Sequence, residues 1–323
     1  MRTPLLWFGR AGAVALATAL VACSAPRPPA DEAGGGALKV VSTFLPITLF
    51  TRAVAGDCAT VTALIPPASS PHDFQASPGD LAALGEAQVL VKNGLELEGF
   101  LDKLVASAEN PDLVVIDSSG GVATIDSPEE SGHDHGHDHG HGHGHGHAHG
   151  DVNPHIWLDP LRAVQQVETI RDGLVEVDPS CAQGYRGNAE AFISQLQELN
   201  TEIAGQLAPY AGKTFVTFHD FAPYFAERYG LRTEYLVDVP ELNPSPADLQ
   251  RVADQVESTQ LKALLSEPQE GDRSFNALAR DLGVRISVFD PLETGSEQAS
   301  LDPTTYLSVM RSNVANLRQA FGG

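Results

Sequence analysis

Basic residues are scarce in this chain of 323 residues: 20 Lys and Arg stand against 42 Asp and Glu, which gives a formal net charge of −22. A protein that binds nucleic acid needs a basic face to neutralise phosphates, so this composition excludes nucleic acid as a partner and favours the approach of cations. The chain is not disordered throughout, because 42% of its residues are apolar and can form real cores. Its length predicts roughly two domains.

Long apolar runs are also missing, and the one at the start is too short to cross a membrane. Arg2 and Arg10 precede twelve apolar residues at 11–22, whereas a spanning helix needs about 20. Residues 1–22 are therefore predicted to be a signal peptide. The sequence up to Cys23, LVAC, resembles the lipobox of bacterial lipoproteins, which implies cleavage before Cys23 and lipidation of its sulfur and new amino terminus; an ordinary secretory signal is the alternative.

The segment that would follow the cleavage site, residues 23–36, is rich in Pro, Gly and Ala and is predicted to be a flexible tether. Cleavage would remove two arginines and no acid, so the mature net charge becomes −24. The chain is expected outside the cytoplasm, in the periplasm or at the cell surface, and held at the membrane only by its lipid.

Cysteine is rare as well, with three residues in the chain. Lipidation of Cys23 leaves one pair, Cys58 and Cys181. Because an exported chain folds in an oxidising compartment, the pair is predicted to form a disulfide. Two buried free thiols are the alternative.

Short runs rich in Val and Ile alternate with helical patterns along the chain, which predicts an α/β fold with parallel sheets. The predicted strands fall into two groups, so we expect two similar lobes, at 37–181 and 209–323. The span 182–208 has apolar residues at helical spacing and no proline, which predicts one long, rigid helix between the lobes. The runs lie at 38–44, 61–65, 88–92, 113–117, 214–218, 262–266 and 284–289, with a further strand near 235.

Histidine is concentrated in one segment, residues 133–149, where it occupies every second position among glycines. This segment lacks any large aliphatic residue, so it is predicted to be a mobile loop. Its histidines are candidate low-affinity metal ligands; a repeat expansion with little consequence is the alternative. They are His133, His135, His137, His139, His141, His143, His145, His147 and His149.

The three remaining histidines, His72, His155 and His219, all lie in loops or at strand ends. Asp290 likewise follows a predicted strand. In open α/β sheets ligands bind beyond the carboxyl ends of the strands, so these side chains can meet in a cleft between the lobes. Three imidazoles and one carboxylate form a tetrahedral set suited to zinc, although copper and nickel would compete.

Other acids could complete or support this site. Water, Glu267 and Glu241 are alternatives to Asp290 as the fourth ligand. A ligating histidine usually donates its second ring N–H to an oxygen acceptor, and the acids adjacent to the ligands could serve as acceptors; capping of helix N-termini is an equal alternative for them. These adjacent acids are Asp73, Asp159 and Asp220.

These motifs together resemble the solute-binding lipoproteins of bacterial zinc and manganese ABC transporters, specifically the zinc type with a His-rich loop. The resemblance runs from about Leu38 to the C-terminus through segments such as SSPHDFQASP, NPHIWLDP, FHDFAPYF and VFDPL. It implies two lobes bridged by a rigid helix, with His72, His155, His219 and Asp290 as zinc ligands. Manganese members tend to carry glutamate where this chain has His219. Some zinc members carry an acid where this chain has Pro71.

The resemblance further implies a monomeric binding protein that captures Zn²⁺ as cargo and delivers it to a membrane permease powered by a separate ATPase. A manganese-binding protein of the same class is the nearest alternative. A zinc hydrolase would need an open coordination position and a general base, and no His-Glu-x-x-His motif occurs in the chain. We therefore expect no enzymatic activity. Lipid anchoring would also permit an adhesin, for which no specific motif occurs in the sequence.

Overall fold

The computed structural model describes residues 37–127, 151–240, 242–268 and 273–322. The predicted signal peptide, tether and lipidation site at Cys23, and the His-rich segment 133–149, lie outside the described residues. Residues Ala37–Gly323 form one compact unit. No helix in the described part of the chain is long and apolar enough to cross a membrane.

The first half of this unit contains a four-stranded parallel sheet in the order β2-β1-β3-β4. The central strand β1 is almost wholly buried, whereas the edge strand β4 exposes Val114 and Val115. The elements of this half are β1 (Leu38–Ser42), α1 (Leu45–Ala55), β2 (Ala59–Ala63), α2 (Pro78–Glu86), β3 (Val89–Lys92), α3 (Leu101–Ser107) and β4 (Val114–Asp117).

The second half repeats this arrangement with a parallel sheet in the order β6-β5-β7-β8. All six residues of its central strand β5 are buried. The elements are η3 (Ala208–Tyr210), β5 (Thr214–His219), α6 (Pro223–Arg228), β6 (Arg232–Val237), α7 (Pro246–Thr259), β7 (Ala263–Ser266), α8 (Arg273–Asp281), β8 (Arg285–Val288), α9 (Glu297–Ser300) and α10 (Thr304–Ala320). The predicted α/β fold with two similar parallel sheets is confirmed.

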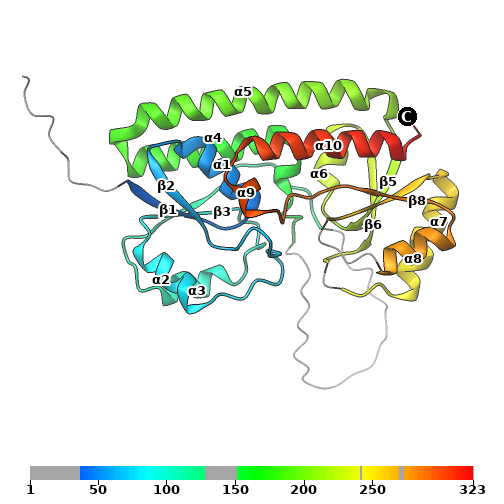
Figure 1. Ribbon diagram of the computed structural model, residues 1–323, viewed down its shortest axis with the longest axis horizontal. Helices are drawn as coiled ribbons and strands as arrows, with labels where there is room; N and C mark the ends of the chain where they lie inside the picture. The colour runs from blue at the N-terminus through cyan, green and yellow to red at the C-terminus, as the bar shows by residue number, and fades with distance from the viewer. Residues whose placement is uncertain (1–36, 128–150, 241, 269–272, 323) are drawn as a thin grey trace, which may run out of the picture. The chain divides into compact units, whose positions relative to one another are not determined.

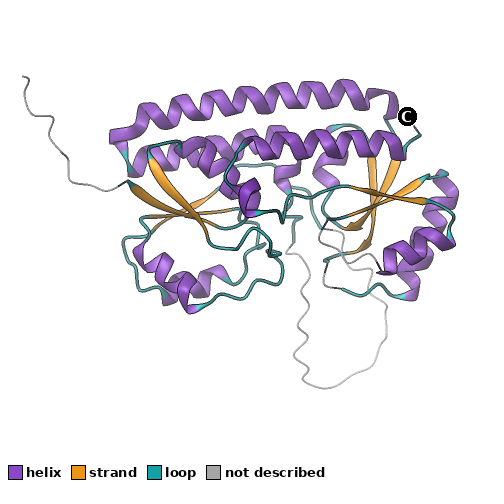
Figure 2. Cartoon of the chain, in the orientation of Figure 1, coloured by secondary structure: helices purple, strands orange, loops and turns teal. Residues whose placement is uncertain are grey.

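A helical segment connects the halves: η1 (Ile156–Leu158), α4 (Pro160–Val177), η2 (Pro179–Cys181) and the 26-residue helix α5 (Ala182–Leu207). The long helix therefore has almost the predicted bounds. Its apolar positions, including Phe192, Leu199 and Leu207, are buried in a core that also contains Val40 of the first sheet and Phe215 of the second. Figure 1 shows α5 running past both sheets, and Figure 2 shows helices flanking each of them.

The chain also returns from the second half to the first after β8, which the sequence does not predict. Gly295 donates its backbone N–H to the carbonyl of Pro67, at 2.6 Å. After α9, helix α10 packs along α5 (Figure 1), and the ring of Tyr306 near the start of α10 lies 5.1 Å from that of Phe50 in α1. The segment between β8 and α9 thus crosses the boundary between the two sheets.

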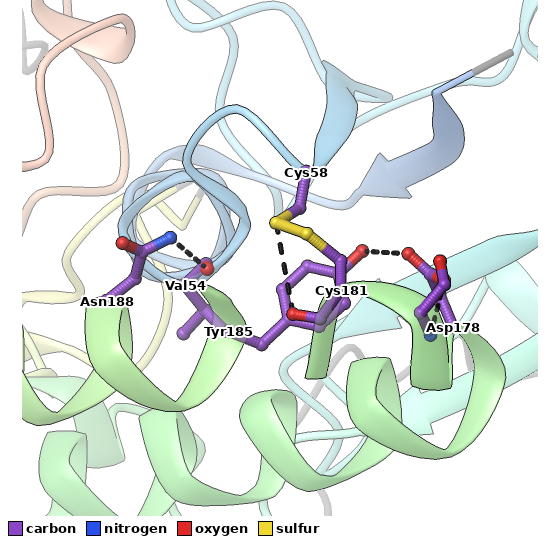
Figure 3. The surroundings of a disulfide bond; sticks show 7 residues. Val54, Cys58, Asp178, Cys181, Tyr185 and Asn188 are labelled. Atoms are coloured by element: carbon purple, nitrogen blue, oxygen red, sulfur yellow. Dashed lines mark hydrogen bonds between the residues drawn. A yellow bond between two sulfur atoms is a disulfide. The ribbon is translucent and has the colours of Figure 1, made fainter. Parts of the chain in front are cut away.

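The predicted disulfide between Cys58 and Cys181 is present, with the two Cα atoms 6.0 Å apart. It joins the turn between α1 and β2 to the start of α5 (Figure 3). Two hydrogen bonds support the same junction: Tyr185 Oη donates to Asp178 Oδ2 at 2.9 Å, and Asn188 Nδ2 donates to the carbonyl of Val54 at 3.1 Å. The first half is therefore fixed covalently to the long helix.

Candidate metal centre

His219 is the last residue of β5 and is fully buried. Glu267, directly after β7, is also buried, and its Oε1 lies 2.6 Å from His219 Nδ1. The same oxygen accepts the backbone N–H of His219 at 3.2 Å. Because β5 and β7 are neighbouring parallel strands, their carboxyl ends meet at one edge of the sheet, and Glu267 fixes the orientation of the imidazole.

His155 lies in the connection between the halves, just before η1, and is fully buried. Asn153 Oδ1 lies 2.9 Å from His155 Nδ1 and accepts the backbone N–H of the same residue at 3.1 Å. Asn153 is held in turn by Asp220, because its Nδ2 donates to the Asp220 carbonyl at 2.8 Å and to Oδ2 at 3.1 Å. The second sheet thereby orients a histidine that it does not itself carry.

His72 comes from the long turn between β2 and α2, in the first half. Its backbone N–H donates to Ser70 Oγ at 3.2 Å, and its side chain is only 6% exposed. The ring centroid lies 5.8 Å from that of His155 and 5.4 Å from that of His219. The three predicted histidines therefore converge.

The carboxylate that lies among them belongs to Glu293, whereas the predicted ligand Asp290 makes different contacts. Asp290 Oδ1 accepts the backbone N–H of Leu292 at 2.7 Å, and the backbone of Asp290 exchanges hydrogen bonds with Asn313. Leu292 has φ of 64°, and the turn it makes places Glu293 among the imidazoles. Asp290 thus shapes the turn that presents the Glu293 carboxylate, because its own Oδ1 accepts a hydrogen bond within that turn.

Four donor atoms, one from each of His72, His155, His219 and Glu293, lie within 4.8 Å of one another. Oε1 of Glu293 is 3.1 Å, 3.0 Å and 3.3 Å from the Nε2 atoms of the three histidines in that order. Oε2 of Glu293 is buried without a hydrogen-bond partner among the described residues. Three neutral nitrogens and one carboxylate are a set that fits a four-coordinate zinc ion.

Hydrogen bonds at Nδ1 of His155 and His219 also favour binding of a metal by the Nε2 atoms of these rings. When Nδ1 of an imidazole donates its N–H to an oxygen, the lone pair remains on Nε2. Asn153 accepts from His155 in this way, and Glu267 from His219. Both rings therefore turn Nε2 toward Glu293, where a metal would accept their lone pairs.

The buried carboxylates and imidazoles of the site shift one another's pKa values. Burial opposes the charged form of His219, but the carboxylates of Glu267 and Glu293 outweigh it and hold the pKa of His219 well above its usual value. Burial would raise the pKa of Glu293, yet His72, His219 and His155 lower it well below its usual value. The charged forms of Glu293 and His219 are therefore favoured before a metal enters, so a metal cation competes with a proton for the His219 ring.

The other acids predicted near the site differ in where they lie and in what they contact. Asp73 is exposed. Asp159 caps α4 by accepting from the Leu161 N–H and pairs with Arg162 and Arg228, so the capping alternative holds for it. Glu241 lies outside the described residues. Glu293 was missed because it stands three residues beyond the strand-end motif, within the return segment whose path the sequence does not reveal.

The chain matches the model of the family described as zinc-uptake complex component A, periplasmic (ZnuA), over residues 40–320. The chain belongs to this family. It is 33% identical over 301 residues to the zinc-binding lipoprotein AdcA of Streptococcus pneumoniae, an alignment that covers 93% of this chain and 58% of AdcA. The chain thus spans little more than half the length of that relative.

Two further proteins are similar to this chain over most of its length. It is 31% identical to the manganese-binding lipoprotein MntA of Halalkalibacterium halodurans, over 93% of this chain and 94% of MntA. The crystal structure of the Zn(II)-bound ZnuA-like domain of S. pneumoniae AdcA is similar with a TM-score of 0.72 and 30% identity, covering 88% of this chain and 99% of that domain. The two-lobe architecture expected from the sequence is therefore that of a known zinc-bound domain.

Proposed function

We propose that this protein binds Zn²⁺ outside the cytoplasm and delivers it to a membrane permease for import. The observation that carries the proposal is the convergence of His72, His155, His219 and Glu293 from both halves of the chain within 4.8 Å. The zinc ion is cargo and not a resident cofactor. Four protein ligands leave no open position for an activated water, which argues against a hydrolase.

Zinc is favoured over manganese by the chemistry of the donors. Manganese prefers carboxylate, carbonyl and water oxygens, whereas imidazole suits zinc, copper and nickel. Three of the four donors here are imidazole nitrogens. The printed name of the MntA relative keeps manganese as the alternative cargo.

The location and partners belong to the same proposal. The apparent lipobox at Cys23 and the lipoprotein names of the relatives support an anchor at the membrane surface. The family description as a component of a zinc-uptake complex supports a partnership with an ABC permease and a separate ATPase. We further propose a monomer with lobes at 37–181 and 209–323 and a linking helix at 182–208.

The test is metal analysis of protein purified without a His-affinity step, with anomalous scattering at the zinc edge. The chain is used without residues 133–149, so that the His-rich segment contributes no zinc. We expect one tightly bound zinc ion per chain, surrounded by the four donors. His155→Ala should lose it; a full equivalent of tightly held zinc in that variant would contradict the assignment.

The His-rich segment is proposed to add several weaker sites. A competitive zinc titration of the full chain and of the chain lacking residues 133–149 separates the two contributions. The tightest binding step should be the same in both, and the additional weak steps should disappear with the segment. Loss of the tightest step would refute this division.

A further inference from the structure

A second pocket lies at the opposite edge of the second sheet, where β5, β6 and β7 begin. Its volume is about 390 Å³ and its lining includes Lys213, Arg232 and Lys262, together with Phe321 at the end of α10. The ring of Phe321 stacks against Tyr210 in η3, with centroids 5.3 Å apart. In Figure 1 this is the region where the carboxyl end of α10 approaches the turn after α5.

The three cations of this pocket lack the acidic partners that some other basic residues of the described chain have. Lys39, Arg228 and Arg311, for example, each lie within 3.1 Å of a carboxylate oxygen. No ion pair joins Lys213, Arg232 or Lys262 to an acid among the described residues, and no acid of that part of the chain lines the pocket. In a protein with a net charge of −22, three cations gathered in one pocket with no acid among its described lining make it a local site of positive charge.

Helix ends account for only part of it. The helices α7 and α10 both end at the pocket, at Thr259 and Ala320. Each carboxyl end carries about half a unit of negative charge, so the two together offset roughly one cation. Arg285 already interacts with the carboxyl end of α10, because its Nη2 donates to the carbonyl of Gln319 at 3.2 Å. The lining cations therefore remain in excess.

We propose that this pocket binds a phosphate group of an anionic ligand. Arginine and lysine are the usual protein partners of phosphate oxygens, and the volume falls in the range of small-molecule sites, roughly 300–1,000 Å³. The apolar wall at Leu261 and Phe321 suits an organic portion attached to the phosphate. That group can belong to a soluble phosphate compound or to the head group of an anionic lipid, and the chemistry recognised is the same.

This site is separate from the metal centre although one strand links them. Thr214 lines the pocket at the start of β5, and His219 ends the same strand. Five residue steps in a strand span about 16 Å, so a phosphate at the pocket does not contact the zinc ligands. Variants of the pocket should therefore leave zinc affinity unchanged, which separates this proposal from the proposed function.

The test compares two triple variants with the same change in net charge. Lys213→Gln/Arg232→Gln/Lys262→Gln removes the pocket cations. Lys103→Gln/Arg186→Gln/Arg280→Gln removes three exposed cations elsewhere. Pyrophosphate is titrated into the metal-free protein at low ionic strength by calorimetry, and vesicles of phosphatidylglycerol or phosphatidylcholine are tested by co-sedimentation.

We expect the pocket variant to lose about tenfold or more in affinity for one of the anionic probes, and the matched variant to lose far less. Binding of pyrophosphate would identify a soluble phosphate as the source, and binding of phosphatidylglycerol vesicles alone would identify a lipid. Equal losses in both variants, or no binding of either probe to the unaltered protein, would overturn the proposal. If the triple variant does not fold, Arg232→Gln alone, on the exposed edge strand β6, decides by the same criteria.

Discussion

The two sheets have the same strand order and direction, yet the residues at the carboxyl ends of their central strands have different roles. In the second sheet, His219 after β5 is a donor and Glu267 after β7 holds it. In the first sheet, the residues at the equivalent strand ends are Thr43 and Asn93, which make hydrogen bonds to the buried carboxylate of Glu98. The same topology therefore places a metal donor and its support at these two strand ends in the second half, and structural hydrogen bonds at the equivalent ends in the first half, whose donor His72 comes from the turn after β2.

The hydrogen-bonded residues Thr43, Asn93 and Glu98 of the first half also support the metal centre indirectly. Glu98 accepts from Thr43 Oγ1 at 2.7 Å and from the backbone N–H groups of Asn93 and Gly94 at 2.8 Å and 3.1 Å. Asn93 Nδ2 donates to the carbonyl of Pro154 at 3.1 Å, directly before His155. The first half thus contributes His72 and positions the connection that carries His155, whereas the second half contributes His219 and its immediate support. Substitutions should separate these two roles.

The largest expected effect concerns the carboxylate that joins the halves. Glu293→Gln removes a buried negative charge from among three imidazoles, and we expect zinc affinity to fall about 100-fold or more. Asp290→Asn is the matched control, because asparagine keeps an oxygen that can accept the Leu292 N–H. Competitive titration with a chelator measures both. If Asp290→Asn weakens binding as much as Glu293→Gln does, the ligand assignment fails.

Removal of the disulfide should affect stability and not metal binding. The bond closes a separation of 123 residues, for which loop-closure entropy predicts about 5 kcal/mol of stabilisation. Cys58→Ser/Cys181→Ser should lower the free energy of unfolding by that order, measured by denaturant titration of the metal-free protein. Reduction of the unaltered protein should reproduce the loss, and the variant should show no further loss. A weakened zinc affinity in the variant would show that the covalent anchor of the first half also shapes the site.

Glu267 and Glu98 occupy comparable buried positions and should give opposite results. Glu267→Gln weakens the hold on His219 Nδ1, and loss of such a support typically costs about 10- to 100-fold in metal affinity. Glu98→Gln leaves one of three backbone or hydroxyl donors unsatisfied, which costs about 1–3 kcal/mol of stability. Zinc titration and denaturant unfolding of both variants provide the comparison. If Glu98→Gln lost as much zinc affinity as Glu267→Gln, Glu98 would act directly on the metal centre.

The sequence predicted the fold and three of the four converging donors because their signals are local. Short buried runs and one amphipathic segment are enough to predict strands and α5, and His72, His155 and His219 stand at loops or strand ends. Glu293 depends on information that is not local. Its position is set by the return of the chain after β8, by the positive φ of Leu292 and by contacts such as Trp157 Nε1 to the Pro291 carbonyl at 2.8 Å. Asp290 has the sequence context of a ligand, but its side chain is used by the turn.

The smallest expected effect is the number of protons released when zinc binds. It should again differ between variants of the two halves. Because Glu267 and Glu293 hold the pKa of His219 well above its usual value against the effect of burial, the protonated form of this ring is favoured in the metal-free protein. Zinc must displace that proton from Nε2. We expect zinc binding at pH 7 to release about one proton, and affinity to fall further as pH decreases. Calorimetry in two buffers of different ionisation enthalpy measures the release.

The same shift has a defined consequence for stability. A histidine whose folded pKa lies above its unfolded value of about 6.5 stabilises the fold below that pH, and this contribution disappears as pH rises through the folded pKa. The metal-free protein should therefore lose stability as pH rises above about 6.5, while the zinc-bound protein should not. Glu267→Gln removes one of the two carboxylates that raise the pKa of His219, so it should reduce both the proton release and this loss of stability. Glu98→Gln, in the half that carries no such pair, should change neither, and a reduced proton release in that variant would place part of the electrostatic control of His219 in the first sheet.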